Sequence, residues 1–429
     1  SSSTTTTLDG FGRTISTNNS MDVRTTSTFD ACGHKTYASY PSLSTPGTGT
    51  TYTNDGLDRV TRMTNPDSSY VTYAYSSTNG IDVTITDENL HATAQDWSAF
   101  GDPGDARLVA VTDAREATFS YSYNAVGNLK GVTASGGGGG PAAGRTWHYN
   151  NKNQLDTETH PETGTLTYTY YGAGNLKTKT DAAFGVTTYT YDANERLTGI
   201  DRFGSFYDTT IGYDGSANRT SLVNGYVTST FGFDGANRLT SRQDVVNGQT
   251  LTATYTPDAN DNLQTIDYPS GNSVVYTYDS ENRISTVKNG PGTVTYADTF
   301  TYHPSGSPLS FKPGGSANLN PAQVFTYDNR YRLKTLGTGQ RSLTYGYDNV
   351  GNATSITEGT RSGRTNRSPI GYDAVDRLTS VSGFAAGSYA YDALGNRTSS
   401  TVADTPATYT YASATARLTS FTGSGTLVY

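Results

Sequence analysis

One short phrase returns many times along the chain. "YTYDANERLTGI" (189–200) comes back as "YTYDSENRISTV" (276–287) and as "FTYDNRYRLKTL" (325–336). Tyr189 and Tyr191 are two residues apart, so both project from one face of an extended chain. Asp192 and Asn194 then favour a turn, because their short side chains bond local backbone groups. Each copy of the phrase therefore predicts a β-hairpin.

The copies are counted from the anchor, defined here as the aromatic residue just before each turn. Clear copies have anchors at Tyr191, Tyr213, Phe233, Tyr278, Tyr327, Tyr347, Tyr372 and Tyr391. Degenerate copies are anchored at Tyr255, Tyr302, Tyr411, Tyr170, Tyr149, Tyr123, Trp97, Tyr75, Tyr52, Phe29 and Leu8. Nineteen anchors from residue 8 to residue 411 give a mean period of 403/18, about 22 residues, which indicates a tandem-repeat architecture.

A single hairpin of this length is not stable in water, so neighbouring copies must complete one another. Thr and Tyr alternate at 167–170, a pattern typical of a half-buried strand, and helical periodicity is absent. We predict one all-β domain over 1–429, with degenerate repeats in 1–132, a glycine-rich loop at 133–145 and clearer repeats in 146–429. Open sheets rarely exceed about ten strands before they curl. The tandem hairpins should therefore form a long coiled antiparallel sheet, either a solenoid or a hollow cocoon-like shell.

Composition excludes several classes of function. The formal net charge is −8, which gives no electrostatic support for a nucleic-acid partner. No run of 18 apolar residues occurs, so no membrane span is expected. The single Cys32 cannot form an intrachain disulfide, and the five histidines lack metal-ligand spacing, so no metal or cofactor is expected. The chain opens on Ser rather than Met, which indicates a processed protein or a piece of a longer one.

The phrases "GYDGSANRTSLV", "FDGANRLTSR" and "AYDALGNRTSST" resemble the YD repeats of the RHS (rearrangement hotspot) family. The resemblance covers the whole chain and implies a bacterial, secreted or cell-surface protein whose hairpin ribbon forms a cocoon. In toxin members of that family the cocoon holds a C-terminal toxin, so an enclosed partner polypeptide is implied. The "DPxGL" core and aspartyl protease of those members are missing; "GDPGDARL" (101–108) fits a repeat turn. The resemblance thus implies the shell wall alone.

The repeated polar residues are expected to serve the repeat rather than catalysis. Paired carboxylates can hydrolyse glycosides, but a carboxylate at the same place in every copy is better explained by its turn. This interpretation applies to Asp192, Asp214, Asp234, Asp279, Asp328, Asp348, Asp373 and Asp392. Certain arginines are expected to stack on neighbouring tyrosines or to pair with these aspartates, namely Arg196, Arg219, Arg238, Arg283, Arg377 and Arg397.

Residues that the repeat does not explain are better candidates for ligand contacts. Trp147 and His148 lie together in "RTWHYN", and Trp97 follows "NLHATAQD". An aromatic residue beside a histidine could bind a sugar ring or serve acid–base chemistry. The competing interpretation is that both tryptophans take strand positions where other copies carry Tyr.

Three classes of function follow from these patterns. The first is a non-catalytic shell or scaffold that encloses or displays a partner domain of a larger protein. The second is an extracellular structural or filament-like protein, for which self-association is expected. The third is a module that binds, and could cleave, a cell-surface glycan.

Overall fold

The computed structural model describes residues 3–428 except 45–46, 79, 100–102, 136–143, 203, 205–206, 316–319, 340, 360–365, 394, 413–417 and 424–425. The described residues contain 39 strands and a short 3-10 turn, η1 (Pro103–Asp105). None of the helical structure in the described residues is long and apolar enough to cross a membrane.

The strands follow one another at short intervals along the sequence. Their bounds are β1 (Thr4–Leu8), β2 (Thr14–Asn19), β3 (Arg24–Phe29), β4 (Lys35–Ser39), β5 (Gly49–Asn54), β6 (Val60–Thr64), β7 (Tyr70–Tyr75), β8 (Val83–Thr86), β9 (Ala92–Ser98), β10 (Arg107–Thr112), β11 (Thr118–Tyr123), β12 (Leu129–Ser135), β13 (Arg145–Tyr149), β14 (Leu155–His160), β15 (Gly164–Tyr170), β16 (Leu176–Asp181), β17 (Gly185–Tyr191), β18 (Leu197–Asp201), β19 (Thr209–Tyr213), β20 (Arg219–Val223), β21 (Val227–Phe233), β22 (Leu239–Val246), β23 (Gln249–Pro257), β24 (Leu263–Asp267), β25 (Ser273–Tyr278), β26 (Ile284–Asn289), β27 (Thr295–Tyr302), β28 (Pro308–Pro313), β29 (Gln323–Tyr327), β30 (Leu333–Thr338), β31 (Arg341–Tyr347), β32 (Ala353–Glu358), β33 (Arg367–Tyr372), β34 (Leu378–Gly383), β35 (Gly387–Tyr391), β36 (Arg397–Val402), β37 (Thr405–Tyr411), β38 (Leu418–Thr422) and β39 (Thr426–Val428).

Strands that follow each other in sequence pair antiparallel. Within one repeat β17 pairs with β18, and across the boundary to the previous repeat β17 pairs with β16. The same pairing joins β1 to β2 near one end of the chain and β38 to β39 near the other. The prediction of an all-β antiparallel sheet made of tandem hairpins is confirmed.

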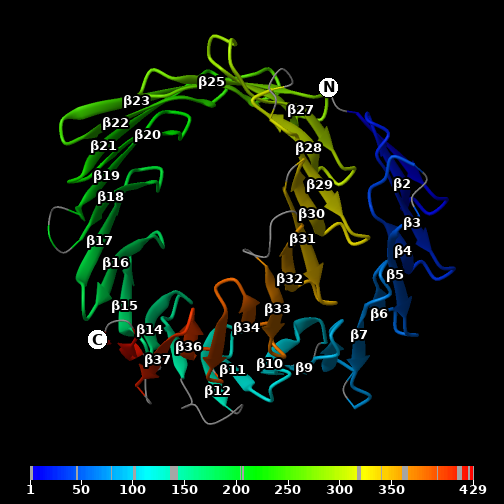
Figure 1. Ribbon diagram of the computed structural model, residues 1–429. Coiled ribbons are helices and arrows are strands. Elements are labelled where there is room, and N and C mark those ends of the chain that lie inside the picture. Colours follow the sequence, from blue (N-terminus) through cyan, green and yellow to red (C-terminus); the bar gives the residue numbers. More distant parts are fainter. Residues whose placement is uncertain are drawn as a thin grey trace. The chain divides into compact units, whose positions relative to one another are not determined.

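Contacts between residues divide the chain into two compact units. Unit 1 comprises Ser1–Gly144, Phe300–Lys312 and Asn320–Tyr429, and unit 2 comprises Arg145–Thr299 and Pro313–Leu319. Within unit 2 the strands from β13 to β26 lie side by side in chain order (Figure 1). Unit 1 combines the first twelve strands with those from β28 onward.

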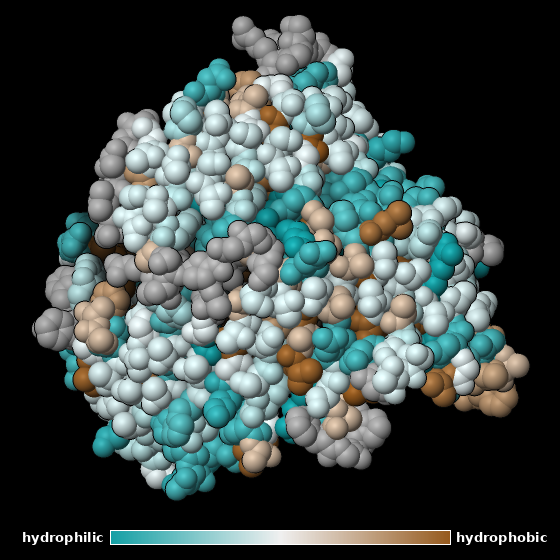
Figure 2. All heavy atoms as spheres, turned by 90° about the horizontal axis from the view of Figure 1, so that it is seen from below, coloured by the Kyte–Doolittle hydropathy of each residue, from teal (hydrophilic) through white to brown (hydrophobic). Residues whose placement is uncertain are grey.

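The sheet is one layer thick, so neither unit has a conventional core. Strand contacts are made between sequence neighbours rather than between stacked faces. In β17 the residue between the two tyrosines, Thr190, is exposed, whereas Tyr189 and Tyr191 are half-buried. The view in Figure 2 shows mostly hydrophilic and near-neutral residues, with hydrophobic side chains scattered among them. Among the described residues, the buried hydrophobic side chains are Ala117, Ala134, Leu166, Ile370 and Ala393.

A β-bulge lies at the turn end of the hairpin. Tyr191 faces Leu197, Thr190 faces Gly199 and Tyr189 faces Ile200, so the second strand carries one extra residue. The bulge places Leu197 and Ile200 on the same face as the tyrosines, although they are three residues apart. The same shift comes just before the anchor in other hairpins, such as those ending at Tyr170, Tyr213, Phe233, Tyr278, Tyr327, Tyr347, Tyr372, Tyr391 and Tyr411.

The predicted bounds of the glycine-rich loop were too wide. Residues 133–135 end strand β12 and Arg145 begins strand β13. The β-propensity of Val132 and Thr133 and of the aromatic run after Arg145 extends both strands into the predicted loop. Most of the loop, 136–143, lies outside the described residues.

Candidate functional site

Each hairpin turn is organised by the residue after the anchor. In the turn 192–196, Asp192 Oδ1 accepts the backbone N–H groups of Asn194 (2.9 Å) and Arg196 (3.0 Å). The fourth residue, Glu195, has a φ of 62° in the left-handed region, and its N–H donates to the Asp192 carbonyl at 3.0 Å. These bonds satisfy the backbone groups that the strand ladder leaves unpaired at the turn.

The donors lower the pKa of Asp192, and the backbone N–H of Arg196 is the main cause. Hydrogen bonds to the charged form of a carboxyl group favour that form. The pKa is also below its ordinary value at further turn aspartates, namely Asp214, Asp234, Asp279, Asp348 and Asp373.

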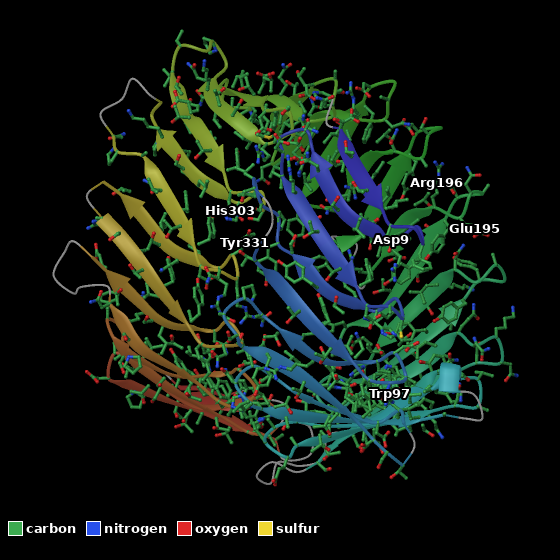
Figure 3. The ribbon with its side chains drawn as sticks, turned by 90° about the vertical axis from the view of Figure 1, so that its right-hand side faces the viewer. Asp9, Trp97, Glu195, Arg196, His303 and Tyr331 are labelled. Carbon is green, nitrogen blue, oxygen red and sulfur yellow. The ribbon has the colours of Figure 1, made fainter. Side chains whose placement is uncertain are left out.

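Arg196 joins its own turn to the next one. Its Nε donates to Asp192 Oδ2 at 2.7 Å, and its Nη1 donates to the backbone carbonyl of Asp214 in the next turn at 2.9 Å. The guanidinium carbon lies 4.8 Å from the centre of the next anchor ring, Tyr213. Figure 3 labels Glu195 and Arg196 together at this turn. We call this set of contacts between successive turns a joint. A single ion pair of this exposure is weak, but Arg332 and Arg377 form the same three contacts.

A histidine replaces the arginine in one joint of unit 1. His34 Nδ1 bonds Asp30 Oδ2 and its Nε2 bonds Asp58 Oδ1 of the next turn, both at 2.7 Å. The bonds to Asp30 and Asp58, in that order, raise the pKa of His34. Asp30, Cys32 and His34 bring three metal-ligand atoms within 4.8 Å of one another. Both ring nitrogens are bonded to carboxylates, so His34 is accounted for by the joint.

A second kind of joint uses asparagine. Asn218 Nδ2 donates to Asp214 Oδ2 and to Oδ1 of Asn237, the left-handed residue of the next turn, at 2.9 Å each. Asn262 and Asn352 bridge to the next turn in the same way, through Asn282 and Asp376.

Arg219 and Arg397 therefore do not pair with the turn aspartate as Arg196 does; the expected stacking on tyrosine is confirmed for Arg397, whereas Arg219 stacks on a phenylalanine. Asparagine takes the fourth place after the aspartate in these copies, so the arginine moves one residue on and occupies the place of Leu197. Arg219 lies opposite Tyr213 and stacks on Phe231 at 5.0 Å. Arg397 lies opposite Tyr391 and stacks on Tyr389 at 5.0 Å.

The anchor tyrosines form a hydroxyl ladder between repeats. The Tyr278 hydroxyl donates to the backbone carbonyl of Leu263, the first residue of the preceding repeat's second strand, at 2.6 Å. Equivalent bonds run from Tyr75, Tyr123, Tyr170, Tyr213, Tyr327, Tyr347, Tyr372, Tyr391 and Tyr411. These ten anchors therefore hold successive hairpins together by a bond that phenylalanine cannot make.

Two degenerate anchors were assigned two residues too early. In the hairpins around Asp55 and Asp258 the register shift falls at Asn54 and Pro257. Tyr52 and Tyr255 therefore correspond to Tyr189, the aromatic residue two positions before the anchor Tyr191. Asn54 and Pro257 occupy the anchor position in these two hairpins, and the nearest aromatic residue lies two positions earlier.

Trp97, a candidate ligand contact, lies at a regular anchor position. It faces Leu108, and the register shift lies between Asp96 and Trp97, just before the anchor, as it does before Tyr191; Figure 3 labels Trp97. Its backbone N–H donates to Asp82 Oδ1 at 2.7 Å.

Trp147 and His148 lie on opposite faces of β13. Trp147 is half-buried and its ring meets His160 edge-on, with centroids 5.7 Å apart. His148 has a side chain 74% exposed and bonds Asp156 Oδ1 at 2.6 Å. The structure therefore does not combine Trp147 and His148 into one site.

Sequence reasoning missed the carboxylate opposite Trp147. Glu158 takes the place of Ile200 in the hairpin, accepts the Tyr168 hydroxyl at 2.5 Å and lies 3.2 Å from His160 Nε2. Burial raises the pKa of Glu158, but the bonds from Tyr168 and His160 outweigh it and leave the pKa below its ordinary value. Burial, followed by the bond to Glu158, raises the pKa of Tyr168. Glu158 is therefore a partly buried carboxylate whose hydrogen bond and ion pair are made within the sheet.

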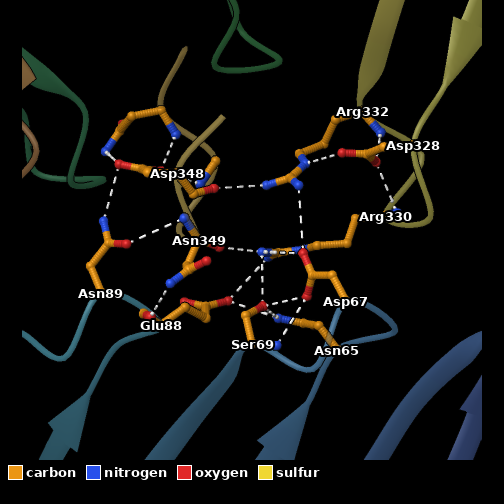
Figure 4. A network of polar contacts seen from close by, with 12 residues as sticks. Asn65, Asp67, Ser69, Glu88, Asn89, Asp328, Arg330, Arg332, Asp348 and Asn349 are labelled. Atoms are coloured by element: carbon orange, nitrogen blue, oxygen red, sulfur yellow. Dashed lines mark hydrogen bonds and ion pairs between the residues drawn. The ribbon is translucent and has the colours of Figure 1, made fainter. Parts of the chain in front are cut away.

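In unit 1, turns far apart in sequence meet edge to edge (Figure 4). Arg330, between β29 and β30, contacts Glu88 Oε1 at 3.1 Å and Ser69 Oγ at 3.3 Å, and it also donates to the Asn349 carbonyl. Asn89 Nδ2 donates to Asp348 Oδ2 at 3.0 Å. The Arg330 and Glu88 side chains are 15% and 13% exposed, so their contact is largely shielded from water.

The edge contact extends to both sides of Arg330. The Tyr331 hydroxyl donates to the Pro41 carbonyl at 2.7 Å, and its ring lies 5.0 Å from Tyr40 and 4.3 Å from His303. Tyr331 has a φ of 63°, a strained value for a bulky residue, and the contacts fix it there. On the other side Arg115 Nη1 reaches the Asp392 carbonyl at 3.5 Å.

The turns that meet lie at opposite ends of the strands. The early turns, at 65–69, 87–91 and 113–117, connect one repeat to the next, whereas the late turns, at 328–332, 348–352 and 392–396, lie within repeats. Turns on the two sides of the sheet are thus in contact although they are 242–290 residues apart in sequence. The sequence signal was faint: "NPDSS", "DENLH" and "DAREA" have the turn geometry of a hairpin at places where most copies have looser connections.

The comparisons with known proteins agree with this repeat. The RHS Repeat family matches residues 170–204, 258–295 and 372–407. The chain therefore contains RHS repeats, which confirms the resemblance found in the sequence. A comparison with curated protein sequences found no match.

Solved structures of toxin complexes share the fold. The crystal structure of TcdB2–TccC3 without its hypervariable C-terminal region has a TM-score of 0.72 at 13% identity, covering 99% of this chain and 26% of that one. Another crystal structure of TcdB2–TccC3 has a TM-score of 0.71 at 14% identity, covering 99% and 26%. The Tc holotoxin pore of Photorhabdus luminescens has a TM-score of 0.70 at 13% identity, covering 99% and 25%. This chain spans about a quarter of the length of these structures, and the similarity establishes its fold.

Proposed function

We propose that the chain is part of the wall of a secreted or cell-surface shell that encloses a partner polypeptide. The contacts between distant turns of unit 1 carry the proposal. A one-layer sheet can enclose a space only if it curves until its turns meet, and these contacts join such turns. There the polar turns interlock through Arg330, Glu88, Asn89 and Asp348.

The similarity to the TcdB2–TccC3 structures supports a role within a larger assembly. This chain covers about a quarter of those structures, so further segments would complete the enclosure. The half-buried aromatic face of the sheet supplies a surface on which an extended polypeptide can lie.

We also propose that the wall is not an enzyme. Both oxygens of Asp192 are held by hydrogen bonds from Asn194 and Arg196, and the same holds at Asp234 and Asp373. A carboxylate occupied in this way and with a lowered pKa is poorly suited to act as a general acid.

The test is limited proteolysis, read by mass spectrometry, of the natural polypeptide that contains this chain together with whatever co-purifies with it. We expect a polypeptide outside the repeats to be protected in the wild type and cleaved in the double variant Arg330→Ala, Glu88→Ala. Arg242→Ala, which removes an exposed pair with Asp244, is the control and should preserve protection. Absence of any protected partner, or equal protection in the double variant, would refute the proposal.

A further inference from the structure

In one joint of unit 2, glutamine takes the place of the bridging arginine or asparagine. In the turn 150–154, Asn150 takes the place of Asp192 and Gln154 that of Arg196. Asn150 Oδ1 accepts the N–H groups of Lys152 (2.8 Å) and Gln154 (3.1 Å), and its Nδ2 donates to Gln154 Oε1 at 3.0 Å. The turn keeps its geometry, but no guanidinium extends to the next turn.

Gln154 does not close the gap as asparagine does elsewhere. The left-handed residue of the next turn is Gly174, which has no side chain to accept a bond. Gln154 Nε2 reaches only the Gly174 carbonyl, at 3.4 Å, whereas Asn218 reaches Asn237 at 2.9 Å. A groove of about 500 Å³ remains between the two turns, within the range of small-molecule sites. It is lined by residues 150–152, Gln154, Asp156 and residues 168–172.

Two aromatic rings along this groove are fixed in place. Tyr170 is the anchor that an arginine would cover in a charged joint, and its hydroxyl is held by the Leu155 carbonyl at 2.5 Å. Tyr171 is 37% exposed, and its hydroxyl donates to the Tyr189 carbonyl at 3.0 Å. The groove therefore presents pre-positioned rings to a ligand with an apolar C–H face.

The groove carries one negative and one positive side chain together with neutral hydrogen-bonding groups. Asp156 Oδ1 accepts a bond from His148, while Oδ2 has no partner among the described residues. The side chains of Asn151 and Lys152 are exposed and likewise have no polar partner in the described part of the chain. The charges of Asp156 and Lys152 offset each other, so donors and acceptors are offered without a net charge.

We propose that this groove binds a neutral saccharide. A pyranose ring combines an apolar face, which packs on Tyr170 and Tyr171, with hydroxyl groups that pair with Asp156 and the carboxamides of Asn151 and Gln154. A cation is a poor fit, because Asn150 replaces the usual carboxylate and Lys152 would repel the ligand. An anion is disfavoured by Asp156. The proposal is independent of the shell function.

Isothermal titration of the intact chain with maltotriose and, separately, with chitotriose tests the site. We expect one-site binding of at least one of them. The double variant Asn150→Asp, Gln154→Arg restores the charged joint and fills the groove, so Kd should rise at least tenfold, about 1.4 kcal/mol, with no loss in unfolding midpoint. Asp156→Asn preserves the shape of the groove but removes its charge, so binding should weaken about tenfold.

Asn262→Arg is the matched control, because it introduces an arginine into another joint and should leave binding unchanged. Arginine amide serves as the cationic probe. The proposal is overturned if neither trisaccharide binds, if the double variant binds as tightly as the wild type, or if arginine amide binds more tightly than both sugars.

Discussion

Replacing Tyr278 with phenylalanine isolates the hydroxyl ladder between repeats. The change removes the 2.6 Å bond to the Leu263 carbonyl and leaves the ring in place. Loss of one such bond costs about 1 kcal/mol of unfolding free energy. Tyr191→Phe is the matched control, because among the described residues the Tyr191 hydroxyl makes no hydrogen bond; its cost should be close to zero.

Tyr278→Ala removes the ring as well. The side chain is half-buried, so about 100 Å² of apolar surface is lost, worth about 2.5 kcal/mol at roughly 25 cal/mol per Å². Urea unfolding followed by far-UV circular dichroism should therefore rank the midpoints as Tyr191→Phe above Tyr278→Phe above Tyr278→Ala.

Two results would refute this reasoning. Equal midpoints for Tyr278→Phe and Tyr191→Phe would mean that the bond to Leu263 contributes nothing. A wild-type midpoint for Tyr278→Ala would mean that the rings form a binding platform rather than part of the wall.

Three further predictions concern pH, the edge contact and the repeat. Because the folded-state pKa values of turn aspartates such as Asp192 and Asp234 are depressed, their stabilisation is complete above about pH 4 and is lost as the pH falls through those values; the urea midpoint should decline below about pH 4. Arg330→Ala should cost about 1.5–3 kcal/mol in thermal unfolding, because it removes the cation from the shielded Glu88 and leaves the neutral Asn65 amide as its partner, whereas Arg242→Ala should cost under about 1 kcal/mol. Deleting the whole repeat 213–232 should lower the unfolding midpoint less than deleting half of it, which leaves a strand unpaired and reverses the inward face; equal losses would contradict the repeat architecture.

The hairpins were predictable because every local signal points the same way. Alternating Thr and Tyr, an aspartate after the anchor and a polar turn agree in each copy, and they needed no long-range information. The bulge was also readable in principle: Leu197 and Ile200 are three residues apart, a spacing that puts both on one face only if the strand carries an extra residue.

The edge contact could not be predicted in the same way. Arg330 and Glu88 are 242 residues apart, and each lies in a turn whose local sequence is satisfied by its own backbone. The carboxylate of Glu158 was more accessible to prediction, because the copies carry Ile200, Val287 or Leu336 at that place. A charged residue among aliphatic equivalents marks a departure from the repeat.

The bulge also explains why the anchors are tyrosines. Between repeats, β18 pairs with β19 only through Gly199 and Ile200, so the Leu197 carbonyl lies beyond the ladder. A carbonyl left without a partner there is costly, and the Tyr213 hydroxyl satisfies it at 3.0 Å. A strand end that splays at every turn thus requires a donor from the next repeat, and an aromatic ring with a hydroxyl supplies packing and donor together. Among the described residues, ten anchor tyrosines meet this requirement, although Tyr191 and Phe233 do not, and it favours tyrosine over phenylalanine in a chain that has 33 of the former and 14 of the latter.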